Sequence, residues 1–466
     1  MHAPRVRGWT ADTISRCSAR PRWPRPWRRS LRKPAEPTAG SVRGDDGSGI
    51  NQGSGDGHTG ARSPSATPQA APVRWILAAV PDPLRNILIV ATSRGDARGL
   101  SQVALALAAA DRASVRVLLT DAAAAAWNPS GSDLLNQVPS RIVPCGFSEA
   151  RNVNELADAA HALALAAIDA AVSVPNDIVV LMGDRHELLP LAHGLLLLGL
   201  PIGHVSGGDV TEGAFDDAVR HALTKLSHLH LCTTEEAAQR VLQMGEEPWR
   251  VTVTGEPELD GLVEAAGRTS PGQAGELGFP LEPPLALVTY HPPTLTPELL
   301  EPELEAIVTS LEGARTIIAT HPGAEPGAPK IVARLQRWAA HDPTVHVLPV
   351  LGPLYASLLA RADVVVGNSS SGIIEAPTFK TPVVNVGDRQ RGRVHAINVI
   401  DVPGERTQVR EAIHRALDPS FRASLGGLVN PYGDGHASER IRDILLQADR
   451  VGLLHKRFVD QGRAPE

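Results

Sequence analysis

From residue 85 onward, the chain alternates short apolar runs with longer segments of helical spacing. The first of these, RNILIVATSRGDARGL, passes from an apolar stretch through a small polar turn into SQVALALAAADR, where apolar residues recur at helical intervals. An uninterrupted apolar run followed by such a segment is typical of a buried parallel strand that enters a helix. We therefore predict that a doubly wound sheet begins at Arg85.

The same pattern recurs in two series. The first contains VRVLLT, DIVVLM, PIGHV, LHLCTT and RVTVTG, and the second contains LALVTY, RTIIAT, VHVLPVL, ADVVVG and PVVNV. Between them, residues 264–284 are rich in Gly, Pro and Glu, which is typical of a linker. The sequence thus predicts an α/β protein of two Rossmann-like domains, residues 85–265 and 284–430, with a central cleft between them.

The two ends of the chain differ from these domains. Near the C-terminus, ASERIRDILLQADRVGLL has amphipathic helical spacing, so we expect residues 431–466 to provide a helix that packs back on the first domain. Residues 1–84 are rich in Arg, Pro, Ser and Gly and show no strand or helix period. We expect them to be a disordered low-complexity extension, or a segment upstream of the true start of translation.

Composition narrows the class of protein. The 466 residues are 42% apolar and 21% charged, as in an ordinary globular protein. The net charge is −6 although residues 1–84 hold 13 basic against 6 acidic residues, so the remainder is acidic and nucleic acid is not an expected partner. No apolar run suggests a membrane span. Three scattered cysteines (Cys17, Cys145 and Cys232) favour a reducing cytoplasm, and we expect no metal or other cofactor.

A serine-rich loop carries the first chemical signal. After the strand ADVVVG, the sequence GNSSSGIIEAP places Ser369, Ser370, Ser371 and Gly372 before a helix-like segment. Small residues let backbone N–H groups approach an anion, hydroxyls donate as well, and a helix N-terminus favours negative charge. The alternative is a plain serine N-cap, for which one serine suffices. We predict a phosphate site.

Three arginines follow within five positions in NVGDRQRGR. They occupy alternate positions, so on an extended segment Arg389 and Arg393 would face the same way. A solvated basic patch is the alternative interpretation. It is the weaker one because the surrounding chain is acidic.

Ionisable residues also follow strands of the first domain. GDRHELL places Asp184 at the end of DIVVLM, and HVSGGDVTEGAFDDAVRHALTKLSHLH supplies Asp209 and Asp216. Asp216 precedes a predicted helix, and its simplest interpretation by itself is a helix cap. His291, in TYHPP, follows the first strand of the second domain; such a histidine is more often structural unless it shares a cleft with other ionisable groups.

Taken together, GDRHELL, HVSGGDVTEGAFDDAVRHALTKLSHLH, RVLQMGEEP, GNSSSGIIEAP, NVGDRQRGR and NPYGDGHASERI resemble the hydrolysing UDP-N-acetylglucosamine 2-epimerases. The resemblance runs from Arg85 to Leu454 in order and with the expected spacing. It implies a glycosyltransferase-B-like fold, UDP held mainly by the second domain, and conversion of UDP-GlcNAc and water to ManNAc and UDP, the entry to sialic acid synthesis. The implied partner is a UDP-sugar, and we expect a homo-oligomer, either a dimer or a tetramer.

The resemblance also implies roles for single residues. Asp184 and Asp216 match catalytic carboxylates, and His291 matches a histidine near the substrate. The expected contacts to UDP are Arg94, Ser369, Ser370, Ser371, Gly372, Glu375, Arg389 and Arg393.

Three departures from the family pattern limit these assignments. Some members carry a catalytic Glu where this chain has Ser206, so Asp209 is expected to serve instead. The usual GGE is GGD here, and PGAEPG at residues 322–327 replaces a common PNADPG, which leaves the sugar open. The alternatives are UDP-N,N'-diacetylbacillosamine as substrate, a UDP-sugar glycosyltransferase of the same fold, and a nucleotide-sugar sensor without activity.

Overall fold

The structure, a computed structural model, describes residues 84–128, 132–147, 152–268, 277–323 and 325–460. All of them belong to one compact unit, residues 77–466. The expectation of a disordered extension therefore falls on residues outside the described ranges, apart from Leu84, and so does the middle of the predicted linker.

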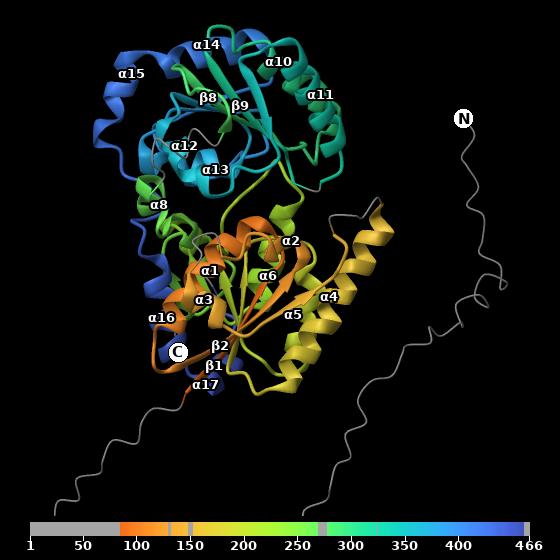
Figure 1. The fold of residues 1–466 in the computed structure, drawn as a ribbon. Helices are drawn as coiled ribbons and strands as arrows, with labels where there is room; N and C mark the ends of the chain where they lie inside the picture. Colours follow the sequence, from red (N-terminus) through yellow and green to blue (C-terminus); the bar gives the residue numbers. More distant parts are fainter. Residues whose placement is uncertain (1–83, 129–131, 148–151, 269–276, 324, 461–466) are drawn as a thin grey trace, which may run out of the picture. The chain divides into compact units, whose positions relative to one another are not determined.

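Seven parallel strands form the first sheet, in the order β3-β2-β1-β4-β5-β6-β7 (Figure 1). The strands are β1 Arg85–Ala91, β2 Ala113–Thr120, β3 Ser140–Val143, β4 Ile178–Met182, β5 Ile202–Val205, β6 Leu229–Cys232 and β7 Val251–Val253. The helices between and after them are α1 Arg94–Ala108, α2 Asp121–Ala124, α3 Asp133–Gln137, α4 Val153–Ser173, α5 Leu188–Leu197, α6 Asp216–Leu226, α7 Glu235–Gln243 and α8 Leu262–Arg268, with short 3-10 turns η2 Pro248–Arg250 and η3 Pro257–Leu259.

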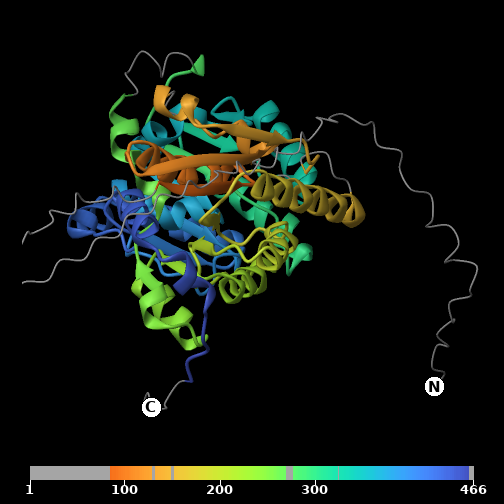
Figure 2. The ribbon, with the colours of Figure 1, turned by 90° about the horizontal axis from the view of Figure 1, so that it is seen from below.

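Both faces of this sheet are apolar, because successive side chains of a strand point to opposite faces and β1 is apolar from Ile87 to Ala91. Ile87 and Ile89 of β1 pack with α1 on one face, where Ile441 and Leu445 from the C-terminal part of the chain join the same cluster. Leu88 belongs to a second cluster under α4 and α5 on the other face. Figure 2 shows α4, in gold, lying along the strands of this sheet.

The second sheet has six parallel strands in the order β10-β9-β8-β11-β12-β13. They are β8 Leu285–Thr289, β9 Thr316–Thr320, β10 Val345–Leu348, β11 Val364–Gly367, β12 Val383–Val386 and β13 Val399–Val402. Its helices are α10 Leu300–Val308, α11 Ala328–His341, α12 Tyr355–Arg361, α13 Ser370–Ile374, α14 Arg406–Leu417 and α15 Pro419–Ser424, with 3-10 turns η5 Pro297–Leu299, η6 Gly352–Leu354, η7 Ala376–Phe379 and η8 Leu425–Gly427. The chain ends with α16 Ala437–Gln447 and α17 Arg450–Leu454.

The predicted fold class, an α/β protein with two doubly wound sheets, is confirmed. Two strands were missed, β3 and β13. Both are edge strands of four residues with partly exposed side chains. Neither strand is a continuous buried apolar run, so periodicity alone does not reveal it.

Helix α4, 21 residues long, is apolar enough on average to cross a membrane by length and composition. Its Ala159, Leu163 and Ala167 are buried in the core beside β1 and β2. A core helix of a globular domain passes the same test of length and composition, so the packing of α4 against the sheet accounts for its apolar face.

Each sheet reverses its strand order at one place. β1 lies between β2 and β4 in the first sheet, and β8 lies between β9 and β11 in the second. In open parallel sheets, ligands bind beyond the carboxyl ends of the strands at such a reversal. The turns after β1, β4, β8 and β11 are therefore the places where a site is expected.

Candidate active site

The four turns at the strand reversals carry predicted site residues. Arg94 begins α1 after β1, and Asp184 follows β4. His291 follows β8, and Ser369 follows β11 as the N-cap of α13. The fold thus delivers residues from both sheets to the edges where strand order predicts binding.

Arg220 of α6 joins two of the predicted carboxylates. Its guanidinium donates to Asp184 and lies 3.9 Å from an oxygen of Asp209. It also donates to the backbone oxygen of Ser206 at 2.9 Å. Asp209 is 5% exposed and accepts a hydrogen bond from Thr233 at 2.7 Å. Because Arg220 itself is 3% exposed, these charges interact in a poorly solvated environment, where each is felt strongly by the others.

Asp216 lies next to this group. Burial and the charge of Asp184 raise its pKa to about 6, although Arg185 and Arg389 act in the opposite direction. A carboxyl group with this pKa exchanges a proton near neutral pH, as a general acid or base must. The interpretation as a helix cap is wrong, since the N-cap of α6 is Phe215 and no side chain caps the helix there.

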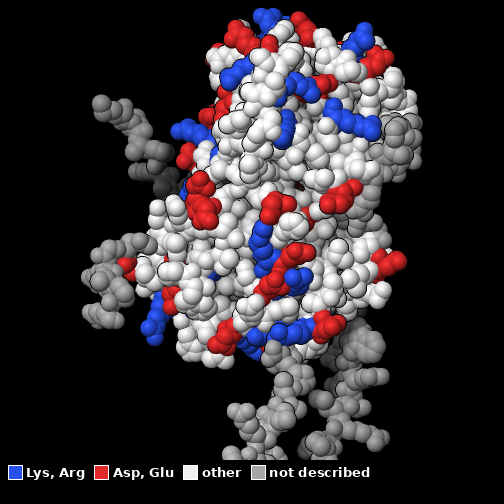
Figure 3. Space-filling model, turned by 90° about the vertical axis from the view of Figure 1, so that its left-hand side faces the viewer, with Lys and Arg blue, Asp and Glu red and all other residues white. Residues whose placement is uncertain are grey.

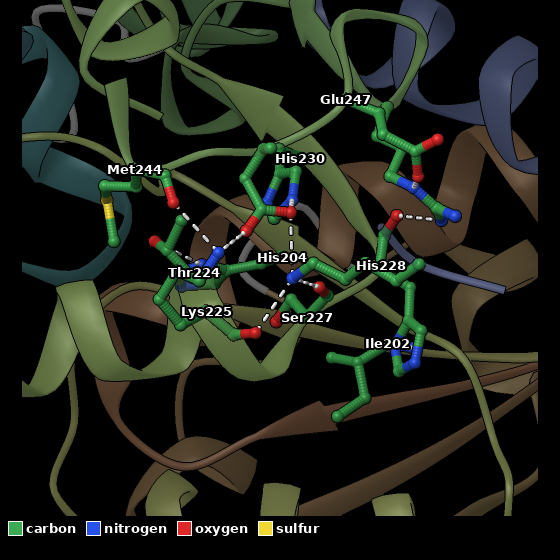
Figure 4. A network of polar contacts seen from close by, with 12 residues as sticks. Ile202, His204, Thr224, Lys225, Ser227, His228, His230, Met244 and Glu247 are labelled. Carbon is green, nitrogen blue, oxygen red and sulfur yellow. Dashed lines mark hydrogen bonds and ion pairs between the residues drawn. The ribbon is translucent and has the colours of Figure 1, made fainter. Parts of the chain in front are cut away.

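His204, labelled in Figure 4, contacts the turn after β4 and fixes it. His204 is fully buried, and burial lowers its pKa to about 3, so the ring is neutral. Nε2 lies 2.7 Å from the backbone oxygen of Gly183, which can only accept, and Nδ1 lies 3.3 Å from the Thr224 hydroxyl of α6. His204 therefore connects the turn that carries Asp184 to the helix that carries Arg220.

The same view shows a second set of contacts, around Lys225, Ser227 and His230 at the C-terminal end of α6 (Figure 4). Glu246 pairs with Lys225 at 2.5 Å, with His230 at 2.8 Å and with Lys456 at 2.8 Å. Lys456 also donates to the backbone oxygens of Lys225 and Ser227. These bonds attach the C-terminal segment to the C-terminal end of α6.

In the second sheet, His291 and Arg389 converge on Glu325. His291 Nδ1 lies 3.1 Å from one Glu325 oxygen, and Arg389 lies 3.7 Å from the other. These contacts lower the pKa of Glu325 to about 2 although burial acts in the opposite direction. Asn368 holds the arrangement: its side chain exchanges hydrogen bonds with the backbone of His291, and its own backbone oxygen accepts from Arg389 at 3.2 Å.

The serine loop is partly open to solvent. Ser369, Ser370 and Ser371 are all half-buried, and the Ser369 hydroxyl accepts from the Ser371 N–H at 3.4 Å. Gly372 faces the sheet, where an added Cβ would lie 2.9 Å from Val383. Since α13 has only five residues, its dipole adds little, and the hydroxyl and N–H donors are what the loop offers an anion.

The expectation of an extended arginine segment is wrong. Residues 387 and 388 bend and residues 389–392 form a turn, with Gly387 and Gly392 at positive φ of 78° and 82°. Arg391 is consequently exposed and pairs with Glu212 at 3.3 Å. Arg389 and Arg393 are half-buried, and the Nε of each is buried with no hydrogen-bond partner among the described residues.

Glu375 is more enclosed than its predicted role suggests. It is 1% exposed, and it accepts from Tyr355 at 2.6 Å and from Arg98 of α1 at 2.7 Å. Each carboxylate oxygen keeps a second lone pair for a further donor. Arg94, by contrast, is exposed at the start of α1.

Several residues of this site were not assigned from sequence. Arg98, Arg220, His204 and Glu325 act through contacts with residues far away in the chain. Arg220 and His204 lie inside a long motif that resembles the family, so the sequence pointed to them. No motif in the sequence pointed to Arg98. No group of three or more metal-ligating side chains occurs within the described ranges. On the face shown in Figure 3, acidic and basic side chains intermingle without a patch of one sign.

Two doubly wound parallel α/β sheets of this order define a protein of the glycosyltransferase-B-like fold class. The profile of the UDP-N-acetylglucosamine 2-epimerases matches residues 149–446, and the chain belongs to this family.

Individual relatives support this family assignment. The chain is 34% identical to the UDP-N,N'-diacetylbacillosamine 2-epimerase (hydrolyzing) of Legionella pneumophila, over 65% of this chain and 79% of the relative. It is 31% identical to a UDP-N-acetylglucosamine 2-epimerase of Neisseria meningitidis serogroup B, over 62% and 76%. Among solved structures, the UDP-GlcNAc 2-epimerase of Neisseria meningitidis bound to UDP-GlcNAc superposes with a TM-score of 0.67 at 19% identity, covering 78% of this chain and all of that one. This last likeness shows the fold.

Proposed function

We propose that this protein is a hydrolysing UDP-N-acetylglucosamine 2-epimerase that converts UDP-GlcNAc and water to ManNAc and UDP. The observation that carries the proposal is the arrangement of Asp184 and Asp209 around Arg220, with Asp216 beside Asp184, at the edge of the first sheet. Family membership supports the UDP-sugar, and the serine loop with Arg389 is the proposed UDP diphosphate site.

The chemistry explains why one site needs both edges. The C2–H of the sugar has no adjacent carbonyl, so its proton is hard to remove unless the C1–O bond to UDP breaks in the same process. Donors at the second sheet stabilise the departing diphosphate. Carboxylates at the first sheet take the C2 proton and balance positive charge on the sugar. Loss of UDP leaves a 2-acetamidoglucal, and water added across its double bond gives the free 2-epimer.

UDP-N,N'-diacetylbacillosamine is the second candidate substrate. The relative at 34% identity carries that name, and PGAEPG places Glu325 between His291 and Arg389. A longer acid at this position changes the space beside the sugar. We place the reaction in the cytoplasm, in keeping with the two unpaired cysteines of the described ranges.

The test is an incubation of purified protein with each UDP-sugar, without an acceptor, in deuterated water. The proposal expects release of UDP together with a free 2-epimer that carries solvent deuterium at C2, because a proton removed to a carboxylate is replaced from solvent. A glycosyltransferase would turn over little without an acceptor. A free 2-epimer without deuterium at C2 would refute the elimination and hydration route.

A further inference from the structure

A fourth carboxyl group lies beside this cluster and matches none of the residues assigned above. Glu256 follows β7, just before η3, and is 3% exposed. The Ser206 hydroxyl donates to its Oε2 at 2.9 Å. Its Oε1 is buried and has no hydrogen-bond partner among the residues that the structure describes. An ionised carboxylate in this position would carry buried charge on an unpaired oxygen, which is costly.

The backbone around Glu256 holds it in this position. Ser206 adopts a φ of 61°, a left-handed conformation that a residue other than glycine rarely takes. In this conformation its hydroxyl reaches Glu256 while its backbone oxygen accepts from Arg220 at 2.9 Å. On the other side, the Glu256 N–H donates to the backbone oxygen of Tyr432 at 2.8 Å. Strain of this kind persists where the surrounding structure fixes it.

Five segments bring ionisable groups to Glu256. Asp209 and Glu258 are acidic, Arg220 and Arg393 are basic, and Tyr432 is a neutral phenol. These groups come from the loop after β5, η3, α6, the turns after β12 and the segment before α16. Burial first, and then the charge of Asp209, raise the pKa of Glu256 to about 7, while Ser206 and Arg393 act in the opposite direction.

A charge count around Arg220 indicates which group holds a proton. Four acids, Asp184, Asp209, Asp217 and Glu256, act on Arg220, and Arg393 is a second guanidinium group beside Glu256. The acids outnumber the guanidinium groups, which favours a proton on one of the acids. Glu256 is the acid with the unpaired buried oxygen, whereas Asp184 and Asp209 accept hydrogen bonds from Arg220 and Thr233.

We propose that Glu256 is a positioning residue which carries this proton, so that it adds no further negative charge beside Asp184 and Asp209. The proposal rests on the proposed function, in which those two aspartates serve the reaction. Its consequence is that ionising Glu256 adds an unbalanced negative charge beside Asp209 and opposes the build-up of charge on the departing diphosphate. Activity should then fall as the pH rises through the range where Glu256 loses its proton.

The test compares kcat across pH for wild type, Glu256→Gln and Ser206→Ala. Glutamine keeps the shape and the neutral state, so Glu256→Gln should retain kcat below neutral pH and lose the alkaline fall that wild type shows near pH 7. Ser206→Ala removes a hydrogen bond that favours the ionised form, so the fall should move to higher pH. Glu236→Gln, an exposed change on α7, is the matched control and should leave the profile unchanged.

Two outcomes overturn the proposal. One is an alkaline fall that persists unchanged in Glu256→Gln. The other is a loss of kcat in Glu256→Gln at every pH of the ~10² expected for a group that itself transfers a proton. Thermal melts of each variant separate misfolding from either result.

A second measurement does not depend on turnover. The infrared carbonyl band of a protonated carboxyl group should be present in wild type and missing from Glu256→Gln about one pH unit below the pKa of about 7, and should disappear from wild type about one unit above it. Absence of such a difference overturns the proton assignment. If wild type released no UDP from either sugar, the proposed function would fail, and this band would still decide the state of Glu256.

Discussion

At the carboxyl edge of the first sheet, charged side chains pair mainly with one another. Arg220 and Asp209 are each 5% exposed or less, and Asp184 pairs with Arg220. At the carboxyl edge of the second sheet, the serine loop offers neutral hydroxyl and N–H donors that are half open to solvent, and Arg389 keeps an Nε without a protein partner among the described residues.

This difference separates two tasks. Charges that interact in a buried network shift one another's proton affinity, which suits proton transfer. The neutral hydroxyl and N–H donors of the serine loop receive an anion without first having to break an ion pair of their own. Two sheets of the same topology thus present edges of different chemistry, and the proposed reaction needs one of each.

The largest expected effect is on the first edge. Asp184→Asn and Asp216→Asn each keep the shape of the side chain and remove its charge and basicity. We expect each to lower kcat by at least the ~10² that general acid–base catalysis contributes, while UDP affinity stays near that of wild type. Steady-state kinetics and calorimetric titration with UDP measure the two quantities.

The control for these variants is Asp169→Asn, an exposed change on α4 where the side chain pairs with Arg141. It should leave both quantities unchanged. Asp184→Asn also removes a partner of buried Arg220, so a thermal melt must accompany it. A kcat near wild type in both Asp184→Asn and Asp216→Asn would contradict the assignment of proton transfer to this edge.

Variants at the second edge should show the opposite result, a change in UDP affinity rather than in kcat. Ser370→Ala and Arg389→Ala each remove a donor to a charged group, which costs about 1.5–3 kcal/mol, or roughly a 10- to 150-fold rise in the Kd for UDP. Arg391→Ala is the control, because Arg391 lies exposed and pairs with Glu212. Unchanged UDP affinity in both Ser370→Ala and Arg389→Ala would leave the serines as a plain helix cap.

The strands of both sheets, apart from β3 and β13, could be predicted because buried parallel strands are continuous apolar runs. The predicted site residues at strand ends followed from the same argument, since a residue directly after such a run must lie at the carboxyl edge. This is why Asp184, His291 and Ser369 could be placed before any contact was known.

Contacts between distant segments could not be predicted in this way. Arg98 meets Glu375 across 277 positions of the sequence, and Ser206 meets Glu256 across 50. No local period or motif encodes such a pairing. The arginine segment failed for a different reason: Gly387 and Gly392 allow positive φ, and the turns they form override the alternation of Arg389, Arg391 and Arg393.

The smallest expected effect concerns Asp216, whose pKa depends on residues of both edges. Its pKa of about 6 is raised by burial and by Asp184 of the first edge, and lowered by Arg389 of the second. If its carboxylate accepts the C2 proton, kcat/KM should be present above about pH 6 and decline as the pH falls through that value, because protonation removes the base.

The effects of the two edges on Asp216 can be compared by titrating its carboxyl carbon by NMR in isotopically labelled protein. This measurement needs no turnover. Asp184→Asn removes a neighbouring negative charge and should lower the midpoint. Arg389→Ala removes a neighbouring positive charge and should raise it. Arg391→Ala, whose guanidinium lies on the surface, should leave it in place. A midpoint that moves in the same direction in both Asp184→Asn and Arg389→Ala would contradict the assignment of opposing charges to the two sheets, since only a general loss of structure shifts both alike.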